Sequence, residues 1–134
     1  MRFIDTNLFL RYFTSDHEPK DKAVLELLKK VERNEEQVIT TPLVIFETVF
    51  TLQSYYKVPR DEIRDLLDPI LSLRGLRLEM KETVESALEL YASQKSLSFA
   101  DAFSVCYMRK KGLAQIYSFD ADFDKIEGIE RIEP

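Results

Sequence analysis

The stretch RFIDTN, residues 2–7, decides how the rest of the sequence is interpreted. Its apolar pair Phe3 and Ile4 is typical of a short buried parallel strand, which three small polar side chains then end. Such a strand would deliver Asp5 to the carboxyl edge of a sheet, where open α/β folds bind their ligands. The alternative is that Asp5 only caps a helix beginning near Leu8, because Asp is among the commonest N-cap residues. Taken alone, the stretch favours the cap.

The composition is that of an ordinary globular protein. The chain has 134 residues, 45% hydrophobic and 32% charged, which is enough to bury one core. Its net charge of −5 argues against coating nucleic acid by bulk electrostatics, although divalent cations can neutralise an acidic pocket locally. The single cysteine excludes an internal disulfide, and no apolar stretch approaches the ~18 residues of a membrane span. We expect one domain, residues 1–134, in the cytoplasm and without a membrane segment.

Strand patterns alternate with helix patterns along the chain. Strands are expected at residues 3–4, 37–40, 76–79, 114–118 and 129–132, and helices at 8–13, 21–33, 42–55, 59–73, 81–95 and 98–112. Pro69 should kink or divide the fourth helix, while the third is apolar nearly all round and should lie deep against the sheet. The alternation predicts an α/β fold, a three-layer sandwich with a mainly parallel central sheet flanked by helices.

Glu47 is an unexpected charge within the apolar third helix. It shares a helical face with Leu43, Phe46 and Phe50, which predicts a carboxylate sunk among apolar side chains. Such burial is costly unless the carboxylate is paired or holds a cation. A hydrogen bond to neighbouring backbone, or a bridge to arginine, explains the residue equally well.

Two further acidic positions stand at the ends of expected elements. Asp101 lies in the first turn of a helix that Ser98 would cap, so taken alone it is part of a capping box. Asp120 follows its strand much as Asp5 follows the first one, and Asp122 and Asp124 come just after it. We interpret Asp124 as part of a solvated turn.

These acids are expected to meet at the carboxyl edge of the sheet. Four carboxylates in one place repel each other unless a divalent cation sits among them, and the four are Asp5, Glu47, Asp101 and Asp120. Oxygen-only ligands suit Mg²⁺ or Mn²⁺ rather than zinc. The only histidine, His17, is expected at the surface of a polar loop, and the only cysteine, Cys106, in the core.

Four segments resemble the acidic motifs of PIN-domain ribonucleases. Within that family, this short single-domain chain is most similar to VapC-type toxins of toxin–antitoxin modules. These segments are FIDTN at residues 3–7, Thr41-Pro42 through Glu47, SFADA at 98–102 and SFDADF at 118–123. The resemblance covers essentially the whole chain. It implies that Asp5, Glu47, Asp101 and Asp120 are catalytic and bind the metal. It adds Asp122 as a less regular metal ligand, and Thr6, Asn7 and Ser118 as polar support.

The expected function is metal-dependent hydrolysis of RNA phosphodiester bonds by the toxin of a type II toxin–antitoxin system. The resemblance further implies Mg²⁺ or Mn²⁺, a homodimer and a small antitoxin that blocks the site. We expect the partners to bind at Leu8–Leu10 and at the amphipathic helix face from Ile63 to Ile70. Phospho-aspartyl hydrolases and phosphoacceptor modules need further acids directly after the first strand, where Thr6 and Asn7 stand. A catalytically silent RNA-binding or interaction domain on the same fold is the remaining alternative.

Overall fold

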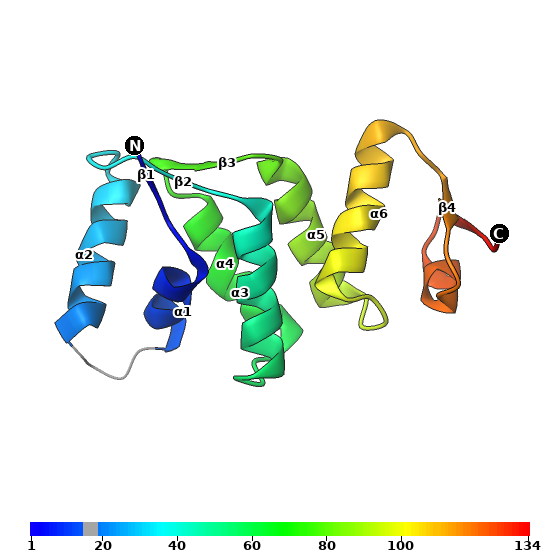
Figure 1. Cartoon of the computed structure of the whole chain (residues 1–134), viewed down its shortest axis with the longest axis horizontal. Coiled ribbons are helices and arrows are strands. Elements are labelled where there is room, and N and C mark those ends of the chain that lie inside the picture. Colours follow the sequence, from blue (N-terminus) through cyan, green and yellow to red (C-terminus); the bar gives the residue numbers. More distant parts are fainter. Residues whose placement is uncertain (15–18) are drawn as a thin grey trace. The chain divides into compact units, whose positions relative to one another are not determined.

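The structure is a computed structural model that describes residues 1–14 and 19–134, with side chains described at 1–14 and 22–134. His17 and the expectation attached to it lie outside the described residues. The chain divides into two units, Met1–Lys81 and Glu82–Pro134, and each is described by itself (Figure 1).

The first unit is built on three parallel strands in the order β1-β2-β3. They are β1 (Arg2–Phe3), β2 (Val38–Thr40) and β3 (Leu76–Leu78), with Phe3 opposite Ile39 and Ile39 opposite Arg77. Parallel neighbours need long crossover connections, and helices supply them here. The helices are α1 (Thr6–Thr14) and α2 (Pro19–Glu32) between β1 and β2, and α3 (Pro42–Ser54) and α4 (Arg60–Leu71) between β2 and β3.

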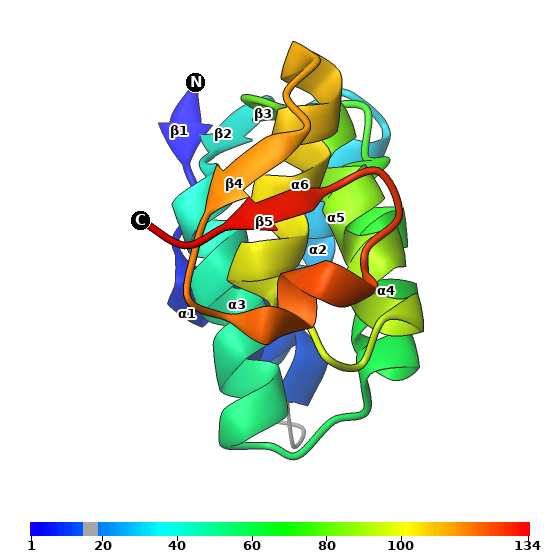
Figure 2. The same cartoon turned by 90° about the vertical axis from the view of Figure 1, so that its right-hand side faces the viewer.

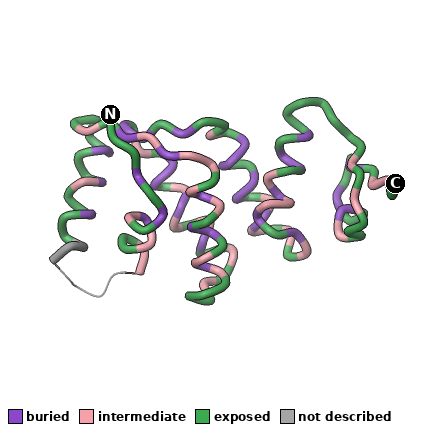
Figure 3. Tube along the Cα trace, viewed as in Figure 1, coloured by how far each residue is buried: buried purple, intermediate pink, exposed green. Residues whose placement is uncertain are grey.

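One face of each helix forms the core of the first unit, as the colouring by burial in Figure 3 shows. Phe9, Ile45, Leu52 and Leu67 are fully buried, and removal of such side chains from water is the main force that holds the unit together. The expectation that α3 lies deep all round is wrong. Its Leu43 is 73% exposed and its Phe50 60% exposed, because α3 turns only one face towards the core.

The two surfaces expected to bind partners are largely buried in this core. Phe9 is fully buried within the 8–10 stretch, and Leu8 and Leu10 are half-buried. On α4, Ile63 and Ile70 are buried as well. Apolar residues at helical spacing therefore mark a core-facing stripe here, and the expectation that these two segments are partner surfaces is corrected.

Helix ends follow the local signals closely. The Thr41 hydroxyl accepts a 3.3 Å hydrogen bond from the Val44 N–H, and Pro42 stands at the first position of α3. Pro69 does not divide α4, which runs on to Leu71. The missing N–H of this proline removes one hydrogen bond of the helix, and only two helical residues follow it.

The second unit contains two helices, two strands and a short 3₁₀ helix. They are α5 (Lys81–Ser93), α6 (Phe99–Lys111), β4 (Gln115–Tyr117), η1 (Ala121–Lys125) and β5 (Glu130–Ile132). The first residue of α5, Lys81, is the last residue of the first unit. β4 and β5 pair in parallel with Ile116 opposite Arg131, and Figure 2 shows them side by side. The rings of Tyr91 and Phe99 meet edge to face at 5.8 Å in the core beneath α5 and α6.

The predicted α/β class, with parallel strands and flanking helices, is confirmed. Hydrogen bonding groups the strands as three and two, and every strand pair is parallel. No helix in the described ranges 1–14 and 19–134 is both long and apolar enough to cross a bilayer.

Candidate functional site

Asp5 stands between β1 and α1, one residue after Ile4 and immediately before the first residue of the helix. Its Oδ1 accepts a 3.1 Å hydrogen bond from the Leu8 N–H, so the residue is the N-cap of α1. The backbone before it is fixed because the Ile4 N–H donates to the Ile39 carbonyl at 2.9 Å and the Thr40 hydroxyl donates to the Ile4 carbonyl at 2.9 Å. The cap occupies one carboxylate oxygen of an exposed side chain. The capping and strand-end interpretations of Asp5 are thus compatible.

The polar residues after Asp5 differ in their surroundings. Thr6 is buried and Asn7 is exposed, both in the first turn of α1. Asn7 therefore shares with Asp5 access to solvent, and Thr6 is held within the fold. Their role as polar support stays a prediction.

Glu47 lies in the middle of α3, and its expected burial is wrong. The side chain is exposed, like its neighbours Leu43 and Phe50 on the same helical face, and Phe46 is half-buried. The apolar face that carries Glu47 is the outer face of α3, whereas Ile45, Thr48, Val49 and Leu52 form the buried one. The cost of burying a charge is consequently no argument for a metal at this residue. α3 packs against α1, the helix that Asp5 caps.

Asp101 occupies the first turn of α6, as the capping box predicts. Its N–H donates a 3.1 Å hydrogen bond to the Ser98 hydroxyl, which caps the helix. The Asp101 side chain is half-buried. The capping bond uses the backbone of Asp101, so the carboxylate is not needed for it.

Asp120 follows β4 and caps η1. Its N–H donates to the Ser118 hydroxyl at 3.0 Å, and its Oδ1 accepts from the Asp122 N–H at 2.9 Å. Ser118 is therefore in contact with the backbone of this acid, and its supporting role stays a prediction. Asp122 is half-buried, with Lys125 Nζ 3.5 Å from its Oδ1.

Asp124 is exposed but not simply solvated, which corrects the interpretation of it as a solvated turn. Its two carboxylate oxygens accept from Nε and Nη2 of Arg131 at 3.0 and 3.1 Å. These hydrogen bonds hold the pKa of Asp124 below its usual range. The sequence gives no signal for this pair, because Arg131 stands among the charged residues Glu130 and Glu133, where a charge is ordinarily solvated.

The structure thus places the predicted site residues in two groups. Asp5, Thr6, Asn7 and Glu47 belong to the first unit, and Asp101, Ser118, Asp120 and Asp122 belong to the second. Within the described part of the chain, no group of three or more His, Cys, Asp or Glu side chains is placed to hold a metal. The convergence of four carboxylates stays a prediction. The predicted ligands are all carboxylates, and oxygen ligands of this kind fit Mg²⁺ or Mn²⁺.

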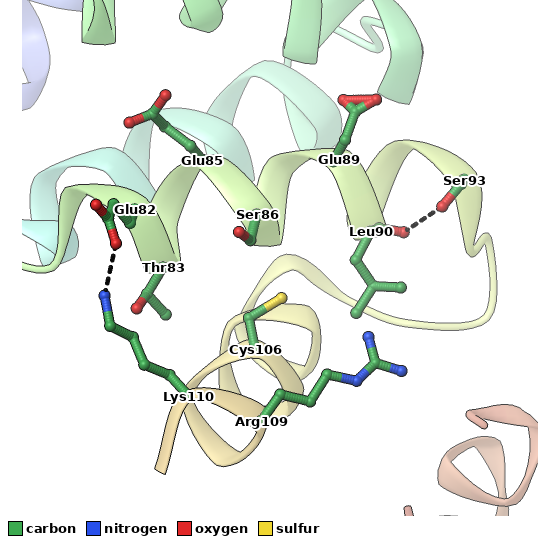
Figure 4. Close-up of a pocket in the computed structure, with 10 residues that line it drawn as sticks. All are labelled: Glu82, Thr83, Glu85, Ser86, Glu89, Leu90, Ser93, Cys106, Arg109 and Lys110. Atoms are coloured by element: carbon green, nitrogen blue, oxygen red, sulfur yellow. Dashed lines mark hydrogen bonds and ion pairs between the residues drawn. The ribbon is translucent and has the colours of Figure 1, made fainter. Parts of the chain in front are cut away.

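A groove of about 910 Å³ lies between α5 and α6 of the second unit (Figure 4). Glu82 and Lys110 form an ion pair of 2.9 Å at one end of it, and hydrogen bonding to Lys110 lowers the pKa of Glu82. Cys106 borders the groove, and burial raises the pKa of its thiol. The groove contains none of the predicted site acids, so it is separate from the candidate site.

Comparison with known proteins shows what the chain is similar to. The family model described as PIN domain matches residues 2–129. A VapC ribonuclease of Aquifex aeolicus is 26% identical over 134 residues, which are 100% of this chain and 97% of that protein. A crystal structure of Mycobacterium tuberculosis VapC20, described as a toxin that cleaves the sarcin-ricin loop, is 24% identical over the whole of both chains, with a TM-score of 0.43.

The family match begins at Arg2 and ends at Ile129, one residue before β5, and so includes every predicted site residue. The resemblance to PIN-domain ribonucleases, and among them to the VapC type, is confirmed. The chain belongs to the PIN domain family.

Proposed function

We propose that this protein is an endoribonuclease that hydrolyses RNA phosphodiester bonds and acts as the toxin of a type II toxin–antitoxin system. The observation that carries the proposal is the shared placement of Asp5 and Asp120. Each lies within three residues of the end of a parallel strand, each is exposed, and each uses Oδ1 to cap the next helix. Acids held this way at strand ends suit a ligand site at a sheet edge. The full-length match to a protein named VapC ribonuclease supports the same activity.

The proposed site consists of Asp5, Glu47, Asp101 and Asp120, with Asp122 as an additional ligand, and it would bind Mg²⁺ or Mn²⁺. The bound cation would supply an acidified water and stabilise negative charge on the phosphate. The caps of Asp5 and Asp120 fix the orientation of two of these carboxylates before any ligand binds. Because acids of both units contribute, the proposal includes that residues 1–134 act as a single nuclease domain.

The proposal also includes partners and a place of action. A homodimer and a small antitoxin would cover apolar surface, and the outer face of α3 offers Leu43 and Phe50 for such contacts. The RNA substrate would be met in the cytoplasm. Light scattering at micromolar concentration tests the dimer, and a clean monomer contradicts it. Expression of the chain alone should slow growth, and co-expression with its antitoxin should restore it.

The test of the activity is incubation of the pure protein with total RNA in Mg²⁺, in Mn²⁺ and in excess chelator. Cleavage should occur with either ion and stop in chelator. Asp5→Asn, Asp101→Asn and Asp120→Asn should each lose several orders of magnitude in rate while they remain folded. Asp65→Asn, an exposed acid on α4, is the matched control and should cleave normally. Undiminished cleavage in chelator contradicts the metal mechanism. RNA binding without any cleavage favours the silent RNA-binding alternative.

A further inference from the structure

Arg131 on β5 makes four hydrogen bonds through one guanidinium group. Nε and Nη2 donate to the two carboxylate oxygens of Asp124 at 3.0 and 3.1 Å, in the paired geometry that suits a carboxylate best. Nη1 donates to the Ser118 carbonyl at 3.2 Å and to Oε1 of Glu133 at 2.7 Å. The Arg131 side chain is only 15% exposed, although Asp124 and Glu133 lie at the surface. These contacts connect β5 with the chain before and within η1.

Two of the partners of Arg131 are the two ends of the segment that carries the proposed metal ligands. We call residues 118–124 the acidic segment. Ser118 begins it and Asp124 ends it, with Asp120 and Asp122 between them. A single side chain therefore holds both ends. The segment is also tied by the Ser118 N–H, which donates to the Ile132 carbonyl at 3.1 Å.

Electrostatics gives this contact a consequence beyond stability. Three carboxylates occur within five residues of the acidic segment, at positions 120, 122 and 124, and they repel one another. Arg131 offsets this repulsion by pairing with Asp124 alone. Asp124 is thereby committed to the guanidinium. Asp120 uses Oδ1 as a cap and Asp122 has Lys125 Nζ 3.5 Å from its Oδ1, so each keeps its second carboxylate oxygen outside these contacts. Lysine would supply the charge but not the planar fork that binds both oxygens of one carboxylate.

We propose that Arg131 is a positioning residue of the nuclease, which acts through Asp124 and the Ser118 carbonyl to hold Asp120 and Asp122 at a fixed separation for a divalent cation. This inference rests on the proposed function, in which Asp120 and Asp122 bind the metal. A held segment loses less conformational freedom when the cation binds, so the affinity is higher than for a loose one. Groups that orient metal ligands typically contribute about 10- to 100-fold to metal affinity.

The experiment measures Mn²⁺ binding to the full chain without RNA, by electron paramagnetic resonance of free Mn²⁺, and thermal unfolding in chelator. The variants are Arg131→Gln, Arg131→Lys, Asp124→Asn and the double variant Arg131→Gln/Asp124→Asn. Glu133→Gln is the matched control, because Glu133 contacts the same guanidinium but lies outside the acidic segment. We expect about a 10-fold or greater loss of Mn²⁺ affinity in Arg131→Gln and in Asp124→Asn. Arg131→Lys should regain little of it, and Glu133→Gln should bind as the wild type does.

The double variant shows whether the two residues act as one unit. Its Mn²⁺ affinity should be no lower than that of Arg131→Gln alone, because Asp124 acts only through Arg131. Lower melting temperatures in chelator with unchanged Mn²⁺ affinity would make the pair purely structural and overturn the proposal. If Arg131→Gln does not fold, the exposed Asp124→Asn and the charge-conserving Arg131→Lys decide the question by the same measurement. A wild-type protein that binds no Mn²⁺ contradicts the proposed metal site itself. A wild type that binds Mn²⁺, with variants that bind it equally well, contradicts only the role of Arg131.

Discussion

The hydroxyl of Thr40, at the end of β2, donates a 2.9 Å hydrogen bond to the carbonyl oxygen of Ile4, the residue before Asp5. Thr40 is 1% exposed and Ile4 is also buried, so water cannot replace this donor. Thr40→Val conserves the shape of the side chain and leaves the buried carbonyl without the bond. We expect a loss of about 1–3 kcal/mol in the free energy of unfolding, measured by urea denaturation.

Thr40→Ser is the matched control for this bond, because it keeps the hydroxyl and removes only a methyl group. It should lose about 0.8 kcal/mol, the value of one buried carbon, and less than the valine variant. A serine variant that is less stable than the valine variant would mean that packing, and not the hydrogen bond, makes Thr40 important.

Asp5 has two separable roles, a cap and a proposed metal ligand. Asn caps helices about as well as Asp, so Asp5→Asn should unfold at nearly the wild-type urea concentration, whereas Asp5→Ala should lose about 1 kcal/mol. Both variants should lose ribonuclease activity under the proposed function. Equal stability of all three proteins would show that the 3.1 Å bond to the Leu8 N–H contributes nothing.

The features that the sequence predicted well depend on a few neighbouring residues. The cap at Ser98 and the end of α6 at Gly112 depend on local side chains, and both occur in the structure. The cap at Thr41 with its following proline is a local feature of the same kind. The Asp5 cap is of the same kind. Such signals need no knowledge of the remainder of the chain, because the atoms that satisfy one another lie within one helical turn.

The failures concern the direction in which a face points. The apolar stripe of α3 that contains Glu47 faces outward, and the stripe of α4 expected to bind partners faces the core. Periodicity shows that a helix has an apolar face, but its orientation depends on packing against distant segments. Arg131 was missed for a similar reason. Its partners Ser118 and Asp124 become neighbours only when β5 pairs with β4.

The backbone of the first unit approaches Gly75 closely. A Cβ added there would be 2.3 Å from the Glu36 carbonyl oxygen and 2.9 Å from that of Val31, distances that real structures do not tolerate. Gly75→Ala must displace backbone and should lose about 1–3 kcal/mol of stability, the usual cost of overpacking, in a thermal or urea melt.

Gly128 provides the contrast to Gly75. Its φ is +82° and no atom lies within 4 Å of an added Cβ, so Gly128→Ala should lose only the cost of a left-handed backbone, about 1–2 kcal/mol. If Gly75→Ala unfolds at the same temperature as the wild type while Gly128→Ala unfolds at a lower one, the backbone of the first unit does not approach Gly75 as closely as described.

Cys106 is 8% exposed on α6, and burial raises the pKa of its thiol against a weaker opposing effect of the Arg109 charge. Because the thiolate is the nucleophile, iodoacetamide at pH 8 should label the folded protein much more slowly than the protein unfolded in urea. The folded state keeps its thiol proton at a pH where the unfolded state, with a thiol pKa of about 8.5, has lost it. The free energy of unfolding should therefore fall as pH rises above that value, and Cys106→Ala should remove this part of the fall. Arg109→Gln should slow labelling further, since it removes the charge that favours the thiolate. Equal labelling rates in the folded and unfolded protein would contradict both the burial of Cys106 and the direction of its pKa.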